Sequence, residues 1–132
     1  MVKRETPAFI TDLQENEIFV FGSNLEGTHA GGAARLAHDN FGAIWGQGVG
    51  LQGSTYAIPT MHGGVEDIRP HVNEFIEFAK SRPDLEFLVT RIGCGIAGFQ
   101  DYEIAPLFTD AAEVENICLP ESFWEVINNQ NK

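Results

Sequence analysis

The feature that most constrains the fold of this chain is a glycine-rich turn directly after an apolar run. Residues 85–89 contain four apolar side chains, and residues 91–99, which follow them, contain Gly93, Gly95 and Gly98. A strand that runs into such a turn and then into a helix points backbone N–H groups and a helix N-terminus toward one spot. This turn therefore predicts a site for an anion such as a phosphate.

Short apolar segments alternate along the chain with segments of helical spacing. The expected strands are residues 17–21, 54–58, 87–92 and 116–119. The expected helices are residues 33–41, 65–82, 102–112 and 120–127. This alternation predicts one α/β domain over residues 1–132, with a mixed, mostly parallel sheet between helices on both faces in a three-layer α/β/α arrangement. Residues 42–53 hold five glycines, so we expect an irregular loop that covers a ligand.

The expected strand ends place a binding site at one edge of the sheet. Ligands of open α/β sheets bind beyond the carboxyl ends of the strands. Asn24, Thr60 and Gly93 each follow an expected strand. We therefore expect three loops that are distant in sequence to converge on one site.

The charge of the chain excludes several classes of partner. Its 132 residues carry 19 acidic side chains against 8 Lys and Arg, a net charge of −11, which would repel nucleic acids and anionic lipid surfaces. No apolar run reaches the length of a membrane span or of a signal peptide. Cys94 and Cys118 lack metal-ligand spacing. We expect a cytoplasmic protein with free thiols, no metal and no cofactor, and the oligomeric state stays open.

Two segments of the chain resemble the signatures of macrodomains, the modules that bind ADP-ribose. Residues 24–33 resemble the first signature, an Asn after a buried strand followed by a glycine cluster that opens a helix. Residues 95–99 resemble the second signature, a loop that wraps the diphosphate and the distal ribose. Residues 91–96, Arg-Ile-Gly-Cys-Gly-Ile, are similar to the branch that contains terminal ADP-ribose protein glycohydrolase. The resemblance implies a macrodomain-like fold and a small nucleotide ligand.

The resemblance also implies roles for individual residues. Asn24 would contact the distal ribose, Phe99 would pack near it, and Asp12 would bind the adenine. Glycines of both signatures would let the backbone approach the phosphates. With the strand ends, the expected ligand-contact set is Asp12, Gly22, Ser23, Asn24, Leu25, Gly31, Gly32, Ala33, Thr60, Gly93, Cys94, Gly95, Ile96, Ala97, Gly98 and Phe99.

Catalysis is left open by the sequence. Met61 and Ala97 stand where the glycohydrolase branch carries a lysine and an aspartate that are implicated in its chemistry. The catalytic candidates are then Asn24 and His29, which would act with a bound water in hydrolysis of an ADP-ribosyl derivative.

Two alternatives from other classes remain at this point. In the first, Cys94 is a nucleophile whose thiol pKa is lowered at a helix N-terminus, and His29 is its base in a small-molecule hydrolase. In the second, the protein binds no ligand, and residues 42–53 form an apolar contact surface or the seam of a dimer. Asp101 flanks the glycine turn, where a carboxylate bonds a ribose hydroxyl or stabilises the next helix.

Overall fold

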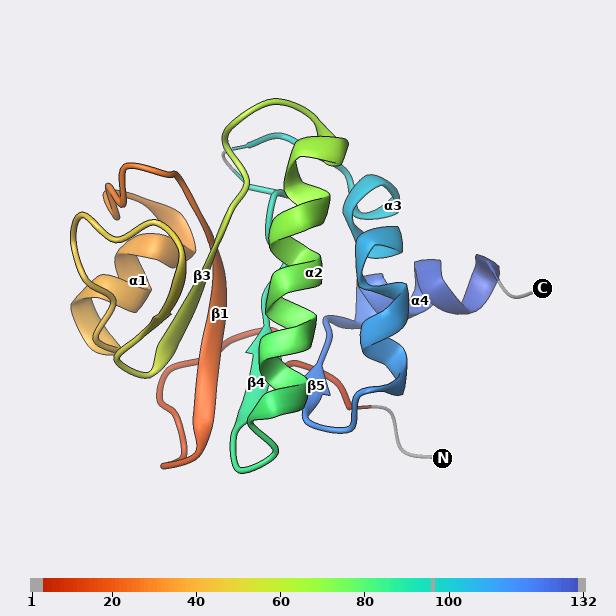
Figure 1. The fold of residues 1–132 in the computed structure, drawn as a ribbon, viewed down its shortest axis with the longest axis horizontal. Coiled ribbons are helices and arrows are strands. Elements are labelled where there is room, and N and C mark those ends of the chain that lie inside the picture. Colours follow the sequence, from red (N-terminus) through yellow and green to blue (C-terminus); the bar gives the residue numbers. More distant parts are fainter. Residues whose placement is uncertain (1–3, 96, 131–132) are drawn as a thin grey trace.

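The computed structural model describes residues 4–95 and 97–130, which form a mixed α/β fold around a five-stranded sheet (Figure 1). The strands are β1 (Glu17–Ser23), β2 (Gly50–Gln52), β3 (Thr55–Pro59), β4 (Glu86–Val89) and β5 (Ile117–Cys118). The helices are α1 (Gly32–Asn40), α2 (Val65–Ser81), α3 (Asp101–Ile104), the 3₁₀ helix η1 (Ala105–Glu113) and α4 (Glu121–Gln130). The predicted α/β class is confirmed. None of the helices in these residues has the length and apolar character needed to cross a membrane.

The sheet has the strand order β2-β3-β1-β4-β5, with β1 at its centre. β1 pairs in parallel with β3, where Val20 lies opposite Tyr56, and with β4, where Phe19 lies opposite Leu88. β4 pairs in parallel with β5, and β2 is antiparallel to β3 at the edge. The segments that follow β1, β3 and β4 therefore all leave the sheet on the same side, at the carboxyl ends of these parallel strands. This is the upper side of the sheet in Figure 1, and we call it the upper edge.

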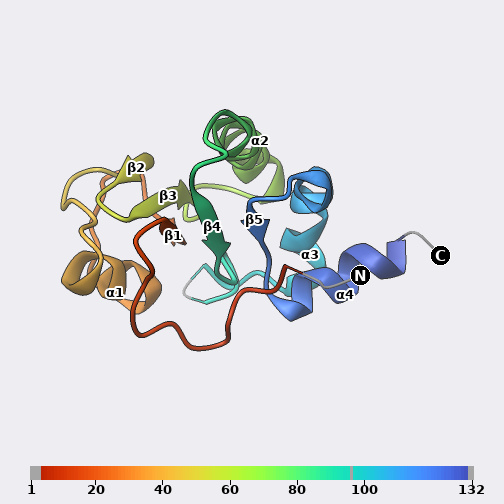
Figure 2. The same ribbon diagram turned by 90° about the horizontal axis from the view of Figure 1, so that it is seen from below.

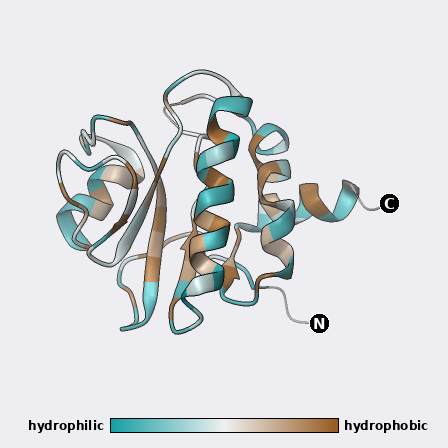
Figure 3. Cartoon of the chain, in the orientation of Figure 1, coloured by the Kyte–Doolittle hydropathy of each residue, from teal (hydrophilic) through white to brown (hydrophobic). Residues whose placement is uncertain are grey.

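The central strand is buried on both faces. Alternate side chains of a strand point to opposite faces, so Ile18 and Val20 join the core under α2, η1 and α4, while Phe19 and Phe21 pack with α1. Figure 2 shows α1 and α2 on opposite sides of the sheet. In Figure 3 the strands are largely hydrophobic, and α2 turns a mostly hydrophilic side outward. Because β1 pairs with both β3 and β4, its position determines where the loops that follow these three strands lie.

The predicted strand 87–92 ends at Val89 as β4, and two further segments differ from their predicted structure. Residues 42–53 were expected to be irregular, but Gly50–Gln52 is the edge strand β2, because the buried Gln52 amide bonds the Ile44 N–H and the Gln47 and Gly50 carbonyls. The expected helix at 102–112 is α-helical only over Asp101–Ile104 and continues as a 3₁₀ helix. A proline near the start of η1 lacks the N–H that an α-helix would use there.

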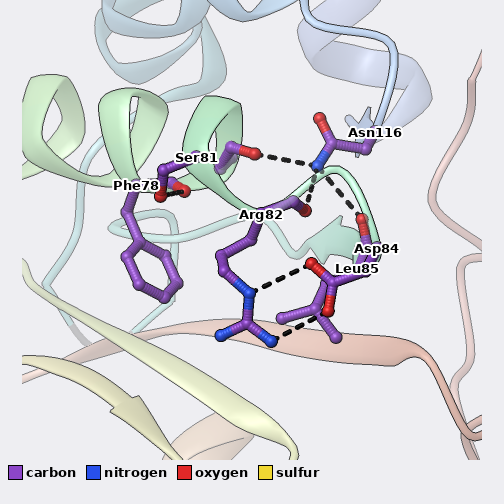
Figure 4. A network of polar contacts seen from close by, with 7 residues as sticks. Phe78, Ser81, Arg82, Asp84, Leu85 and Asn116 are labelled. Carbon is purple, nitrogen blue, oxygen red and sulfur yellow. Dashed lines mark hydrogen bonds and ion pairs between the residues drawn. The ribbon is translucent and has the colours of Figure 1, made fainter.

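A side-chain amide fixes the C-terminal end of α2. Nδ2 of Asn116 donates to the carbonyl oxygens of Ala79, Arg82 and Leu85 at 2.9, 2.9 and 3.0 Å (Figure 4). The last carbonyls of a helix have no partner within the helix. Asn116 precedes β5, so one amide ties the end of α2 and the start of β4 to the β5 edge of the sheet.

We expect Asn116→Ala to lower the free energy of unfolding by about 1–3 kcal/mol, because the three carbonyls lose a side-chain donor, and those of Ala79 and Arg82 keep only the backbone N–H groups of Arg82 and Leu85. Urea unfolding followed by circular dichroism measures the change. Asn73→Ala, on the exposed face of α2, is the matched control and should change stability by less than about 0.5 kcal/mol. Equal effects of the two substitutions would contradict the role given to Asn116.

Candidate functional site

A cavity of about 310 Å³ lies at the carboxyl ends of β1, β3 and β4. We call it the glycine cavity. Ten of the residues predicted to contact a ligand line it: Gly22, Ser23, Asn24, Gly31, Gly32, Ala33, Thr60, Gly93, Gly95 and Ala97. The loop after β1, the first turn of α1, the end of β3 and the glycine turn after β4 thus meet at one place, as the strand order requires.

Glycine lets the three strand ends approach one another. A Cβ atom on Gly22 would lie 3.0 Å from Oγ1 of Thr60 and 3.4 Å from the backbone nitrogen of Gly93. Gly93 itself has a φ of +75°, a conformation that L side chains rarely adopt. By contrast, a Cβ on Gly95 would meet no atom within 4 Å, and its φ is not positive. Gly95 therefore borders open space on the cavity side of the turn.

The N-terminus of α1 faces this cavity without a negative group of its own. Gly31 is the N-cap, no side chain caps the helix, and no acidic residue lies in its first turn. The other three α-helices in the described residues each carry at least one acidic residue in their first turn. Because a helix N-terminus carries partial positive charge, the first turn of α1 is free to receive an anion from outside the chain.

The loop after β1 is held by the side chain of Asn24. Its Oδ1 accepts a hydrogen bond from the Thr28 N–H at 2.8 Å, and its Nδ2 donates to the Thr28 carbonyl at 3.2 Å. The Ser23 hydroxyl donates to the Gly48 carbonyl, which attaches residues 42–53 to the end of β1. Asn24 thus shapes one wall of the cavity from within the loop.

Several of the predicted contact residues do not line the cavity. Asp12 is exposed and borders neither of the two large cavities. Leu25 points its N–H at Nε2 of His62. Phe99 packs against the core, and neither it nor Gly98 borders the cavity. These side chains are turned away because neighbours in a turn point in different directions. The predicted contact at Ile96 lies outside the described residues.

His29 is a packing residue rather than a group that faces the ligand. Its side chain is 1% exposed, and its Nε2 lies 2.8 Å from the Ile44 carbonyl and 3.3 Å from Oε1 of Gln52. Both neighbours are acceptors, so Nε2 carries the hydrogen. The ring packs edge-on against Phe21 and Trp45. The catalytic role considered for His29 does not fit this position, because residues 42–53 cover it.

Cys94 is half-buried, and its surroundings oppose the thiolate. Its Sγ donates to Oδ1 of Asp101 at 3.5 Å. Burial, followed by the Asp101 carboxylate, raises the pKa of the Cys94 thiol to about 12. The lowered pKa on which the hydrolase alternative depends is therefore contradicted, because desolvation and a neighbouring carboxylate both favour the neutral thiol. Cys94 and His29 do not form a nucleophile and base pair, since His29 bonds elsewhere.

Sequence reasoning missed residues that the strand ends place in the cavity. Thr28, Ala30, Ala34, Thr90, Arg91 and Ile92 line it, as does Met61. Thr90 and Arg91 follow β4 as Asn24 follows β1, so the strand-end rule that selected Asn24 also applies to them. Oγ1 of Thr90 donates to the Val20 carbonyl at 2.7 Å, which ties the end of β4 to β1.

A second and larger cavity of about 670 Å³ adjoins the first. We call it the N-terminal cavity, because residues 5–11 form one of its walls. The other walls come from β1, α1, the end of β4 and the start of α4. Ala33, Thr90 and Arg91 line both cavities. The N-terminal wall is held by hydrogen bonds between the backbones of Thr6 and Leu119 and of Leu119 and Arg4.

The lining of the glycine cavity offers donors but few groups for proton transfer. Among the described lining residues, Arg91 is the one titratable side chain. In the same part of the chain, no three His, Cys, Asp or Glu side chains gather to hold a metal ion. Comparisons of the chain with protein-family models, with curated proteins and with solved structures gave no match. What this site binds must therefore be inferred from its geometry, its chemistry and the sequence resemblance.

The raised pKa of Cys94 has a direct consequence for its reactivity. At pH 8 we expect iodoacetamide to label Cys94 in the folded protein on the order of 1000-fold more slowly than an ordinary exposed cysteine, because so little thiolate is present. The rate should rise about tenfold with each pH unit and level off only near pH 12, because the thiolate fraction does the same. Mass spectrometry of timed samples measures it, with the urea-unfolded protein as reference. Equal rates in the folded and unfolded protein would restore Cys94 as a candidate nucleophile.

Proposed function

We propose that this protein binds ADP-ribose or a related nucleotide diphosphate in the glycine cavity. The observation that carries the proposal is the meeting of an acid-free helix N-terminus with two glycine segments at the carboxyl ends of parallel strands. This arrangement directs N–H groups and a helix dipole toward one small volume, which suits phosphate. The resemblance of residues 24–33 and 95–99 to macrodomain signatures supports the same ligand.

The two adjoining cavities suit a ligand with two bulky ends and an anionic centre. The N-terminal cavity has apolar walls that include Ile10, Phe19 and Leu36, and such walls suit an aromatic base. The glycine cavity has backbone and hydroxyl groups that suit a ribose and phosphates. A nucleoside joined through a diphosphate to a second sugar would place one end in each cavity.

The acidic character of the chain is compatible with an anionic ligand. The net charge of −11 acts over the whole surface, whereas the field of a helix end acts within about one turn. Surface charges are screened over about 8–10 Å at physiological ionic strength. A site built from backbone donors is thus local, and it excludes large polyanions while it accepts a small one.

The same geometry favours binding over cleavage. Met61 and Ala97 both line the cavity, at the positions where the glycohydrolase branch has a lysine and an aspartate. Among the described lining residues none is Asp, Glu, His, Cys or Lys, so no side chain there is suited to act as a general base near neutral pH. We infer a module that holds its ligand without hydrolysing it.

Gly95→Glu should lower the affinity for ADP-ribose by about 100-fold or more, because a carboxylate next to the phosphates is repelled and occupies their space. The φ of Gly95 and the open space around it admit a side chain without strain. Calorimetry with ADP-ribose measures the affinity. Gly64→Glu is the matched control. A Cβ on Gly64 also meets no atom within 4 Å, and Gly64 does not line the cavity. The affinity of Gly64→Glu for ADP-ribose should stay within about twofold of wild type. Absence of binding by the wild-type protein would overturn the proposal, and unchanged affinity in Gly95→Glu would place the site elsewhere.

We expect no release of ADP-ribose when the protein is incubated with ADP-ribosylated protein, O-acetyl-ADP-ribose or ADP-ribose 1″-phosphate. The physical reason is the lack of an acid or base among the described residues of the lining. Chromatography of the reaction mixtures against buffer alone measures release. Turnover that disappears in Gly95→Glu would show instead that the cavity is an active site.

A further inference from the structure

Arg91 stands out among the residues that line the two cavities. In the described lining of both, it is the one Lys or Arg side chain, and it borders each of them. Its neighbour Thr90 and Ala33 of the first turn of α1 are the other residues shared by both linings. The seam between the cavities is therefore lined by a residue of the first turn of α1 and by Thr90 and Arg91, which follow β4.

The guanidinium group is held in a fixed orientation by Asp101. Nε and Nη2 of Arg91 donate to Oδ1 and Oδ2 of Asp101 at 3.0 and 2.9 Å. Oδ1 of Asp101 also accepts a hydrogen bond from the Ser122 hydroxyl at 3.2 Å, and the Cys94 thiol donates to the same atom. The carboxylate thus bonds the end of β4, the glycine turn and α4 at once. Because two nitrogens of the guanidinium group bond one carboxylate, the orientation of its plane is restricted.

The paired arginine keeps donors for a ligand. An arginine has five N–H donors in a rigid fork, and the pair with Asp101 engages one on Nε and one on Nη2. The pair with Asp101 does not use Nη1, and the Arg91 side chain is 59% exposed whereas that of Asp101 is 26% exposed. Asp101 offsets part of the charge of Arg91, and the N–H groups that remain supply a donor that is both directed and positively charged.

We propose that Arg91, oriented by Asp101, recognises the diphosphate of the ligand at the seam between the two cavities. This inference rests on the proposed function and adds a charged side chain to a site otherwise made of backbone donors. Arg91 is then a binding residue and Asp101 a positioning residue. The Arg91–Asp101 pair favours ligands whose anionic group lies between their two ends, at the seam. It disfavours ligands whose anionic group lies away from the seam, in either cavity.

The chain supplies a closely matched control for this pair. Nε and Nη2 of Arg82 donate to Oδ1 and Oδ2 of Asp84 at 3.0 and 2.9 Å, the same distances as in the Arg91 pair (Figure 4). Neither Arg82 nor Asp84 lines the glycine cavity or the N-terminal cavity. Arg82→Gln therefore removes the same charge and breaks the same kind of ion pair at a place that the ligand does not reach.

The test is the affinity for ADP-ribose of the wild type, Arg91→Gln, Arg91→Lys and Arg82→Gln, measured by calorimetry at about 50 and 500 mM salt. Arg91→Gln should weaken binding about 10- to 100-fold and reduce its salt dependence. Arg91→Lys should keep the salt dependence and recover part of the affinity, since it restores the charge without the fork. Arg82→Gln should bind within about twofold of wild type. Thermal unfolding of each variant shows whether it is folded.

The outcomes separate this inference from the proposed function. If the wild type does not bind ADP-ribose, both are overturned. If the wild type binds and Arg91→Gln binds equally well, or loses affinity without losing salt dependence, only the inference about Arg91 fails. For Asp101, the effect of Asp101→Asn on affinity should differ by at least about threefold between the wild-type and Arg91→Gln backgrounds. Equal effects in the two backgrounds would remove Asp101 from the proposal.

Discussion

The parallel pairing of β1 with β3 and with β4 is the constraint on which the rest of this structure depends. β1 is buried on both faces, so a shift of one residue in its register would exchange Ile18 and Val20 with Phe19 and Phe21 between two different cores. That cost fixes the register. Once the register of β1 is fixed, the carboxyl ends of β1, β3 and β4 lie side by side. The loops that follow these strands must then lie close together.

Much of the fold could be predicted from the sequence because burial leaves a periodic pattern. The helical spacing of Ile68, Val72 and Phe75 and the apolar run in β1 are local signals. The strand β2 left no such signal, since the side chain of Gln52 organises it through contacts that depend on the folded loop. The 3₁₀ form of η1 was missed for a similar reason, because apolar spacing alone does not distinguish it from an α-helix.

The candidate site was predictable to the level of the backbone but not of the side chains. Strand ends and glycines locate loops, and ten of the expected residues do line one cavity. The direction of a side chain within a turn depends on tertiary contacts, which is why His29 and Cys94 proved to be buried against other groups. The N-terminal cavity had no signal at all, because its wall at residues 5–11 has neither helical nor strand periodicity.

The segment that forms this wall has one further consequence. Its attachments to the rest of the described residues include a β-bridge between Glu5 and Leu119, packing of Ile10 against the smaller core cluster, and bonds of Arg4, among them the one that its carbonyl accepts from the Trp124 indole. Under the proposed function, a ligand with one end in the N-terminal cavity contacts this segment, so the contacts that hold residues 5–11 in place also contribute to the affinity for the ligand. The same proposal implies that a substitution at Arg4, which lines neither cavity, would alter ligand binding through the position of residues 5–11 and not through the glycines.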